Sequence, residues 1–424
     1  MSVGAAPASS NGHILIVGAG IVGASAAYFL RQAGCAVTVL DASTPAAGAS
    51  GASDGLVSVG SKKPGFLMNI ARHARDFYVE LERDGIVRGL FQQRPTFLFA
   101  RNEDEAELMA LHGHDLASAG VRVASLSGAE FGRSIPGVSP AIVAALAVPD
   151  DGHALGYQIV DRMLKLSAAH VVRHAAVRRI KVEHGRAIGV ATDAGDFAGD
   201  AVLIAAGLGS TALAGLGEIL VPRKGQIIIT DRASDNVPAF AGPLMSAAYL
   251  AAKRSVDASR RNPVSLVIDP LNTGQLLIGG TREEGLADRE TTVNHVSRIL
   301  QETLAVYPPA ERRRVIRTFA GVRTASVDGL PIVGRHPGID ALAIATGFEG
   351  DGICLGPLMG RLVAETVLGR PCSLNIDALS PARFAAQDIG ASGGTPHLLP
   401  AGSLAQQPGS GGGQMPASIP GARP

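Results

Sequence analysis

The stretch HILIVGAGIVGASAAYFLRQAGCAVTVLDAS, residues 13–43, joins an apolar run, three spaced glycines and a terminal acidic residue. We expect a short buried strand over residues 13–17, a turn that leads into a helix, and a second strand over residues 36–40. The order strand, helix, strand predicts a β-α-β unit, which is the building block of a Rossmann-like α/β domain.

The three glycines have the spacing of a dinucleotide-binding turn. In this interpretation Gly18 allows a tight turn, Gly20 lets backbone amides approach a pyrophosphate, and Gly23 lets the helix pack closely on the sheet. The amino end of the helix would face the anion. Asp41 stands eighteen positions after Gly23, near the spacing at which a carboxylate accepts hydrogen bonds from ribose hydroxyls. An ordinary tight turn is the alternative.

Composition bounds the class of protein. The chain has 424 residues, of which 46% are hydrophobic and 18% charged, and its formal net charge is +1. This favours a globular protein of two domains and argues against nucleic-acid binding. Cys35, Cys354 and Cys372 are far apart, which suggests no disulfide framework or metal site and favours a reducing cytoplasm. We expect no targeting segment and no membrane span.

The remaining chain alternates between helical and extended patterns. The small-residue loop at 48–65 could run along a flat ring system, which favours a flavin over a nicotinamide, although a flexible surface connection is the alternative. Strands dominate residues 222–282 and predict a largely antiparallel sheet. We expect helices over 64–81, 103–119, 161–174 and 292–307.

Several motifs together resemble one family of flavoproteins. The chain is similar to the D-amino-acid oxidase, glycine oxidase and sarcosine oxidase group over about residues 13–372. The motifs that carry the resemblance are VGAGIVGASAAYFL, GASGASDG, AAGLGS, PRKGQIII, AGVRTASVDGLPIVGR and ATGFEGDGICLGPLMGRLVAE. A finer likeness, in SAAYLAAK and LLIGGTREEG, is to the flavin subunits of multi-subunit amino and imino acid dehydrogenases.

The resemblance implies a Rossmann-like FAD-binding domain beside a second domain with a mainly antiparallel sheet. We expect the FAD-binding domain over residues 13–63, 141–221 and 312–372, and the substrate-binding domain over 64–140 and 222–311. Residues 1–12 are expected to be flexible and residues 391–424 disordered, because these segments are rich in Gly, Ser, Pro and Ala.

The implied reaction is oxidation of the C–N bond of a small amino or imino acid, with hydride transfer to FAD. The candidate substrates are a D-amino acid, glycine, sarcosine, hydroxyproline or an opine. Electrons would pass to partner subunits in an oligomeric or heteromeric complex. One alternative is an oxidase that reduces oxygen to hydrogen peroxide, and another is a non-catalytic flavin-bearing subunit.

The resemblance also assigns site residues. Arg323 matches the arginine that holds the substrate carboxylate, although the family usually has Pro where this chain has Thr324. Tyr249 is expected near the substrate. FAD would be noncovalent, because the matching segments lack the histidine or cysteine that links a flavin. The expected cofactor-binding residues are Gly18, Gly20, Ile21, Val22, Gly23, Asp41, Ala42, Ser50, Ser53, Asp54, Gly55, Leu56, Val177, Ala206, Gly207, Gly350, Asp351, Gly352 and Ile353.

Overall fold

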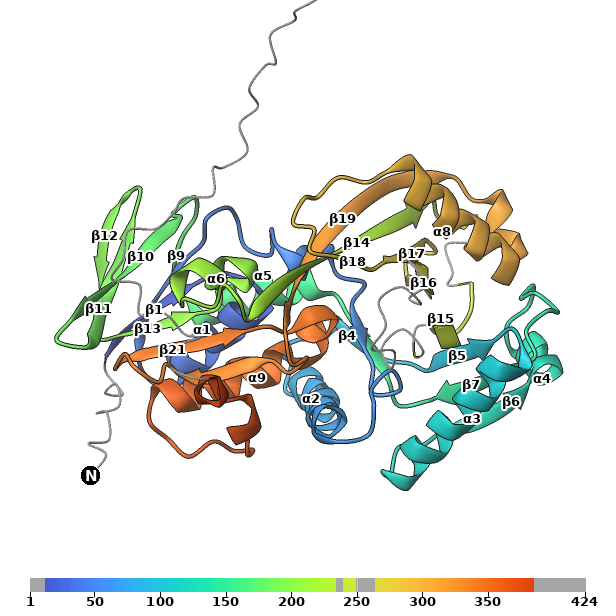
Figure 1. The fold of residues 1–424 in the computed structure, drawn as a ribbon, viewed down its shortest axis with the longest axis horizontal. Helices are drawn as coiled ribbons and strands as arrows, with labels where there is room; N and C mark the ends of the chain where they lie inside the picture. The colour runs from blue at the N-terminus through green and yellow to red at the C-terminus, as the bar shows by residue number, and fades with distance from the viewer. Residues whose placement is uncertain (1–11, 234–238, 249, 251–263, 385–424) are drawn as a thin grey trace, which may run out of the picture. The chain divides into compact units, whose positions relative to one another are not determined.

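A mostly parallel sheet contains the β-α-β unit predicted from the sequence. The computed structural model describes residues 12–233, 239–248, 250 and 264–384 (Figure 1). In this sheet five strands run parallel and β20 pairs antiparallel at one edge. In spatial order the strands are β9 (His170–Val172), β2 (Ala36–Leu40), β1 (His13–Val17), β13 (Ala201–Ile204), β21 (Leu342–Thr346) and β20 (Ile332–Arg335).

The two faces of the parallel sheet pack against different elements. The side chains of β1, which point alternately to one face and the other, show this. Ile14 and Ile16 pack in a core with the helices α1 (Ile21–Gln32), α5 (Gly156–Ser167) and α9 (Gly352–Val367). Leu15 and Val17 point to the other face, where they pack with residues of a three-stranded antiparallel sheet. That sheet consists of β10 (Val177–Glu183), β11 (Arg186–Thr192) and β12 (Gly195–Ala198). Alternate residues of a strand point to opposite faces, so a strand buried on both sides is apolar throughout.

A second sheet is mainly antiparallel, as predicted for residues 222–282. Its longest pairing joins β14 (Leu220–Thr230) to β19 (Val315–Ser326), and these strands appear side by side in Figure 1. Among the described strands of this sheet, β15 and β5 alone pair in parallel. The other strands are β18 (Glu283–Glu284), β17 (Leu276–Thr281), β16 (Val264–Pro270), β15 (Leu244–Ser246), β5 (Thr96–Ala100), β7 (Ala144–Val148) and β6 (Ala124–Ser127).

Shorter elements complete the fold. A small antiparallel sheet contains β3 (Leu56–Val57), β8 (Gly152–Ala154) and β4 (Phe91–Gln93). None of the helices in the described ranges is both long enough and apolar enough to span a bilayer. The remaining helices are α2 (Phe66–Arg83), α3 (Glu103–Ser118), α4 (Gly128–Ser134), α6 (Ser210–Leu213) and α8 (Val293–Val306).

The structure bears on the helix predicted over 161–174 and on the predicted division into domains. The helix predicted over 161–174 is wrong at its end: α5 stops at Ser167, and residues 170–172 form β9, because they pair with β2. The division into two domains remains a prediction, since the described residues fall in one unit. Moreover, β7 and β19 belong to the antiparallel sheet, although their residues lie in ranges predicted for the FAD-binding domain. The predicted flexible and disordered ends lie outside the described residues, apart from Gly12.

The close contact between α1 and α9 generates a stability prediction. A Cβ atom at Gly360 of α9 would lie 2.4 Å from the Ser25 Cβ and 2.8 Å from the Ala26 nitrogen of α1. We expect Gly360→Ala to lower the free energy of unfolding by about 1–3 kcal/mol through overpacking. Gly132→Ala in α4 is the matched control, because no atom lies within 4 Å of its added Cβ, and it should be neutral or slightly stabilising. Chemical denaturation of the two variants measures the difference.

Candidate active site

The glycine turn between β1 and α1 is tightly packed against β13. Gly18 has a φ of +106°, and a Cβ there would lie 2.3 Å from the Ala205 carbonyl oxygen. A Cβ at Gly23 would lie 2.0 Å from the Gly18 carbonyl oxygen. Both positions therefore accept only glycine, and the backbone at the end of β1 can come close to a ligand at the amino end of α1.

The donors at this turn fit a pyrophosphate. The Ile21 amide donates to the Ser50 hydroxyl over 3.0 Å, while the amides of Gly20 and Val22 have no acceptor among the described residues. The Ser50 hydroxyl still has its own proton to donate. Amides and a hydroxyl at a helix amino terminus are the donor set that binds phosphate oxygens.

Asp41 sits beside the same turn. One of its carboxylate oxygens accepts from the Ala19 amide over 2.8 Å, and the other accepts from the Ser43 amide over 2.8 Å. Each oxygen keeps a second lone pair, so the carboxylate can also accept from a ribose hydroxyl. Val177 begins β10, which follows the segment where the Ala175 amide donates to the Asp41 carbonyl. Ala42 directly follows Asp41 in the chain.

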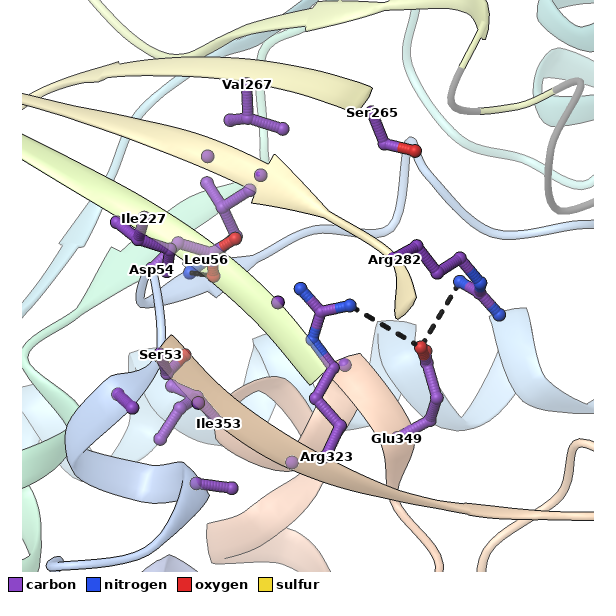
Figure 2. A pocket seen from close by; sticks show the side chains of 18 of the residues that line it. Ser53, Asp54, Leu56, Ile227, Ser265, Val267, Arg282, Arg323, Glu349 and Ile353 are labelled. Atoms are coloured by element: carbon purple, nitrogen blue, oxygen red, sulfur yellow. Dashed lines mark hydrogen bonds and ion pairs between the residues drawn. The ribbon is translucent and has the colours of Figure 1, made fainter. Parts of the chain in front are cut away.

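Many of the other predicted site residues line one pocket (Figure 2). It lies between the 49–56 segment, the antiparallel sheet and the turn before α9. Ala206 and Gly207 follow β13 instead, where the Gly207 carbonyl accepts from Thr346 over 3.0 Å. Tyr249 lies outside the described residues. The predicted residues that line the pocket are Ser50, Ser53, Asp54, Leu56, Arg323, Gly350, Gly352 and Ile353.

A buried ion pair joins the small-residue loop to the turn before α9. The Lys62 ammonium lies 2.8 Å from the Asp351 carboxylate, and their side chains are only 4% and 12% exposed. From the sequence, we expect one or both of Lys62 and Lys63, and also Asp351, to be solvated. Lys63 is exposed as expected, whereas Asp351 is not, because the two loops bury the charges of Lys62 and Asp351 against each other.

Three arginines surround Glu349 at one side of the pocket. The Glu349 carboxylate lies 3.0 Å from Arg223, 3.2 Å from Arg282 and 3.9 Å from Arg323, and Figure 2 shows the last two converging on it. Glu284 pairs with Arg223 over 2.8 Å. Three guanidinium groups thus share two carboxylates, which leaves one positive charge at this side. Glu349 is mostly buried, with 16% of its side chain exposed.

Behind Asp54 lies a buried polar cluster that the sequence did not indicate. Asp269 is fully buried and bonds to Arg94, and one of its carboxylate oxygens has no hydrogen-bond partner. Burial raises the pKa of Asp269 to about 7, although the positive charge of Arg94 acts to lower it. His153 lies 3.6 Å from Asp269, and burial together with Arg94 lowers its pKa to about 3, so it is neutral. Three residues so far apart in the chain share no motif that could have revealed them.

Other titratable groups near the site are structural. Asp151 is buried and accepts hydrogen bonds from the Ser58 hydroxyl over 2.7 Å and the Val59 amide over 2.8 Å. Burial raises the pKa of Cys354 to about 12, so its thiol is protonated and unreactive. In the described part of the chain no group of three His, Cys, Asp or Glu residues could hold a metal ion.

Comparison with known proteins identifies the family. A family model described as FAD dependent oxidoreductase (DAO) matches residues 13–366. The chain belongs to this family. The predicted fold class, the FAD cofactor and the assignment as an enzyme are thereby confirmed.

Individual relatives of this DAO-family protein agree. It is 27% identical over 384 residues to the glycine oxidase of Geobacillus kaustophilus, covering 87% of this chain and 96% of that one. It is 25% identical over 396 residues to a 4-methylaminobutanoate oxidase of Paenarthrobacter nicotinovorans, covering 89% of this chain and 46% of that one. The crystal structure of the Geobacillus kaustophilus glycine oxidase superposes with a TM-score of 0.79 and 25% identity, covering 88% and 99% of the two chains.

The buried ion pair yields a prediction about stability. We expect Lys62→Met to lower the free energy of unfolding by about 3–5 kcal/mol, because it leaves the Asp351 carboxylate buried without its partner. Lys63→Met is the matched control, since Lys63 is exposed, and its effect should stay within about 0.5 kcal/mol. Chemical denaturation of both variants measures this, and equal effects would show that the pair contributes nothing specific.

Proposed function

We propose that this enzyme oxidises the C–N bond of a small amino or imino acid whose carboxylate is held by Arg323. The observation that carries the proposal is the state of the Arg323 guanidinium. It lines the pocket, its side chain is 28% exposed, and it makes no hydrogen bond within the described ranges. Its donors are therefore available to a ligand.

The charges around Arg323 support the same role. Glu349 is closer to Arg223 and Arg282 than to Arg323, so the Arg323 charge is the one least compensated. A planar guanidinium binds a carboxylate through two parallel hydrogen bonds, which sets the orientation of the α-carbon. A structural ion pair, the alternative for this arginine, would place it closer to Glu349.

The relatives' names and the walls of the pocket favour a small substrate. Glycine and 4-methylaminobutanoate, named for two relatives, each have a carboxylate and an amine. The pocket walls include Ile227, Val267 and Ile353, which offer apolar contact to a short carbon chain. FAD bound at the glycine turn would accept the hydride of the α-carbon, while the protein positions the substrate and excludes water.

The first test is reduction of the purified enzyme under argon. Glycine, sarcosine, D-alanine, D-proline and hydroxyproline are added in turn, and we expect at least one to bleach the visible absorbance of FAD. Admission of air then distinguishes the two forms of the function. Rapid recolouring indicates an oxidase, as in the relatives named glycine oxidase. Slow recolouring indicates a dehydrogenase that passes electrons to partner subunits. A fully loaded enzyme that none of these compounds bleaches would contradict the proposal.

The second test removes the guanidinium. We expect Arg323→Ala to lower kcat/KM by about 100-fold, mostly through KM, because losing a charged hydrogen-bonded partner costs about 2–5 kcal/mol. The variant should still bind FAD, as its visible spectrum will show. Arg178→Ala is the control, since Arg178 is exposed, pairs with Asp193 and does not line the pocket. Unchanged substrate affinity in Arg323→Ala would exclude the carboxylate role.

A further inference from the structure

A substrate with a carboxylate also has an ammonium group at neutral pH, and the pocket must receive it. This inference rests on the proposed function. Among the described residues, two carboxylates line the pocket, Glu349 and Asp54. Glu349 is surrounded by Arg223, Arg282 and Arg323, so its charge is already compensated. Asp54 is therefore the carboxylate to consider.

Among the residues that the structure describes, the Asp54 carboxylate has no cationic partner. One of its oxygens accepts from the Leu56 amide over 3.2 Å, and no Lys, Arg or His side chain of the described residues forms an ion pair with it. The Asp54 side chain lines the same pocket as Arg323, and Figure 2 shows both residues there. The Asp54 carboxylate and the Arg323 guanidinium, which face one pocket, are together complementary to the ammonium and the carboxylate of a zwitterionic amino acid.

The groups behind Asp54 strengthen this charge pattern. The His153 ring bonds to the Asp54 carbonyl over 3.1 Å, and the neutral state of this ring adds no positive charge. Asp269, one of whose oxygens is buried without a hydrogen bond, is close enough that the Asp54 charge contributes to its raised pKa. Arg94 is the one cation of the cluster and is bound to Asp269 and to the Pro270 carbonyl. Above neutral pH the Asp269 carboxylate compensates the charge of Arg94, so the Asp54 carboxylate leaves a negative charge at its side of the pocket.

We propose that the Asp54 carboxylate binds the substrate ammonium and accepts one of its protons before the α-hydrogen leaves. In this step an N–H bond of the ammonium breaks and an O–H bond forms on Asp54, and no electrons are gained or lost. The amine is left neutral with a free lone pair. That lone pair forms the C=N bond as the α-hydrogen departs, which a fully protonated ammonium cannot do. The cofactor contact expected for the 53–56 segment can be made by its backbone, which leaves the Asp54 side chain for the substrate.

The experiment compares Asp54→Asn and Asp54→Glu with the wild type, using the amino acid that reduces the wild type fastest. We expect Asp54→Asn to lower kcat/KM at pH 7 by about 10²–10⁴-fold, the usual range for loss of a positioned base. The defect should shrink as pH rises toward the pKa of the free substrate amine, because neutral amine then arrives from solution. Asp54→Glu should restore part of the activity. Asp193→Asn is the control. Asp193 is an exposed residue of the turn that joins β11 to β12, and this variant should behave as wild type.

A second measurement does not depend on turnover. Acetate has a carboxylate and no amine, and its binding is read from the shift of the FAD visible spectrum. Asp54→Asn should bind acetate at least as tightly as the wild type, whereas Arg323→Ala should not. An unchanged kcat/KM at pH 7 in Asp54→Asn would overturn the inference, and so would loss of FAD or weaker acetate binding in that variant. Failure of every amino acid to reduce the wild type would instead reject the proposed function itself.

Discussion

The ion pair between Lys62 and Asp351 is the contact on which the pocket depends. It joins the loop that follows η1 (Ala49–Ala52) and β3 to the turn that opens α9, two segments from opposite ends of the described chain. The 49–56 segment just before this loop and the turn before α9 contribute walls of the pocket. Buried charges are costly to desolvate and gain stability only when paired, so the pair stabilises this one juxtaposition over arrangements in which the loops separate. The Tyr78 hydroxyl adds to it by donating to the Ile353 carbonyl over 2.7 Å.

The two sheets have separate roles in this protein. The parallel sheet brings the glycine turn, Asp41 and the end of β13 to one edge, where FAD is expected to lie across the amino end of α1. The antiparallel sheet supplies Arg323 from β19, Arg282 after β17 and Asp269 from β16. Because β14 and β19 pair along most of their length, Arg223 and Arg323 are opposite each other in register, which places both guanidinium groups near Glu349.

Charge in the pocket is divided rather than uniform. An excess of positive charge lies around Arg323, and an excess of negative charge lies around Asp54 above neutral pH. A pocket with separated charges selects ligands by the spacing of their own charges as well as by size. This division is the physical basis for expecting an amino acid rather than a simple carboxylic acid or a simple amine.

Local features were predictable from the sequence, and features of the tertiary structure were not. The β-α-β unit, the antiparallel strands and the need for glycine at 18 and 23 follow from short-range spacing and from backbone geometry, which neighbouring residues specify. The FAD prediction required the joint resemblance of several motifs. By contrast, residues 170–172 left the helical pattern because β2 offered a pairing partner, and Lys62, Glu349 and Asp351 became buried because distant segments cover them. The cluster of Arg94, His153 and Asp269 likewise exists only where β8, β16 and the connection between β4 and β5 meet. Burial and pairing between remote residues are decided by packing, and no pattern within a short stretch of chain encodes them.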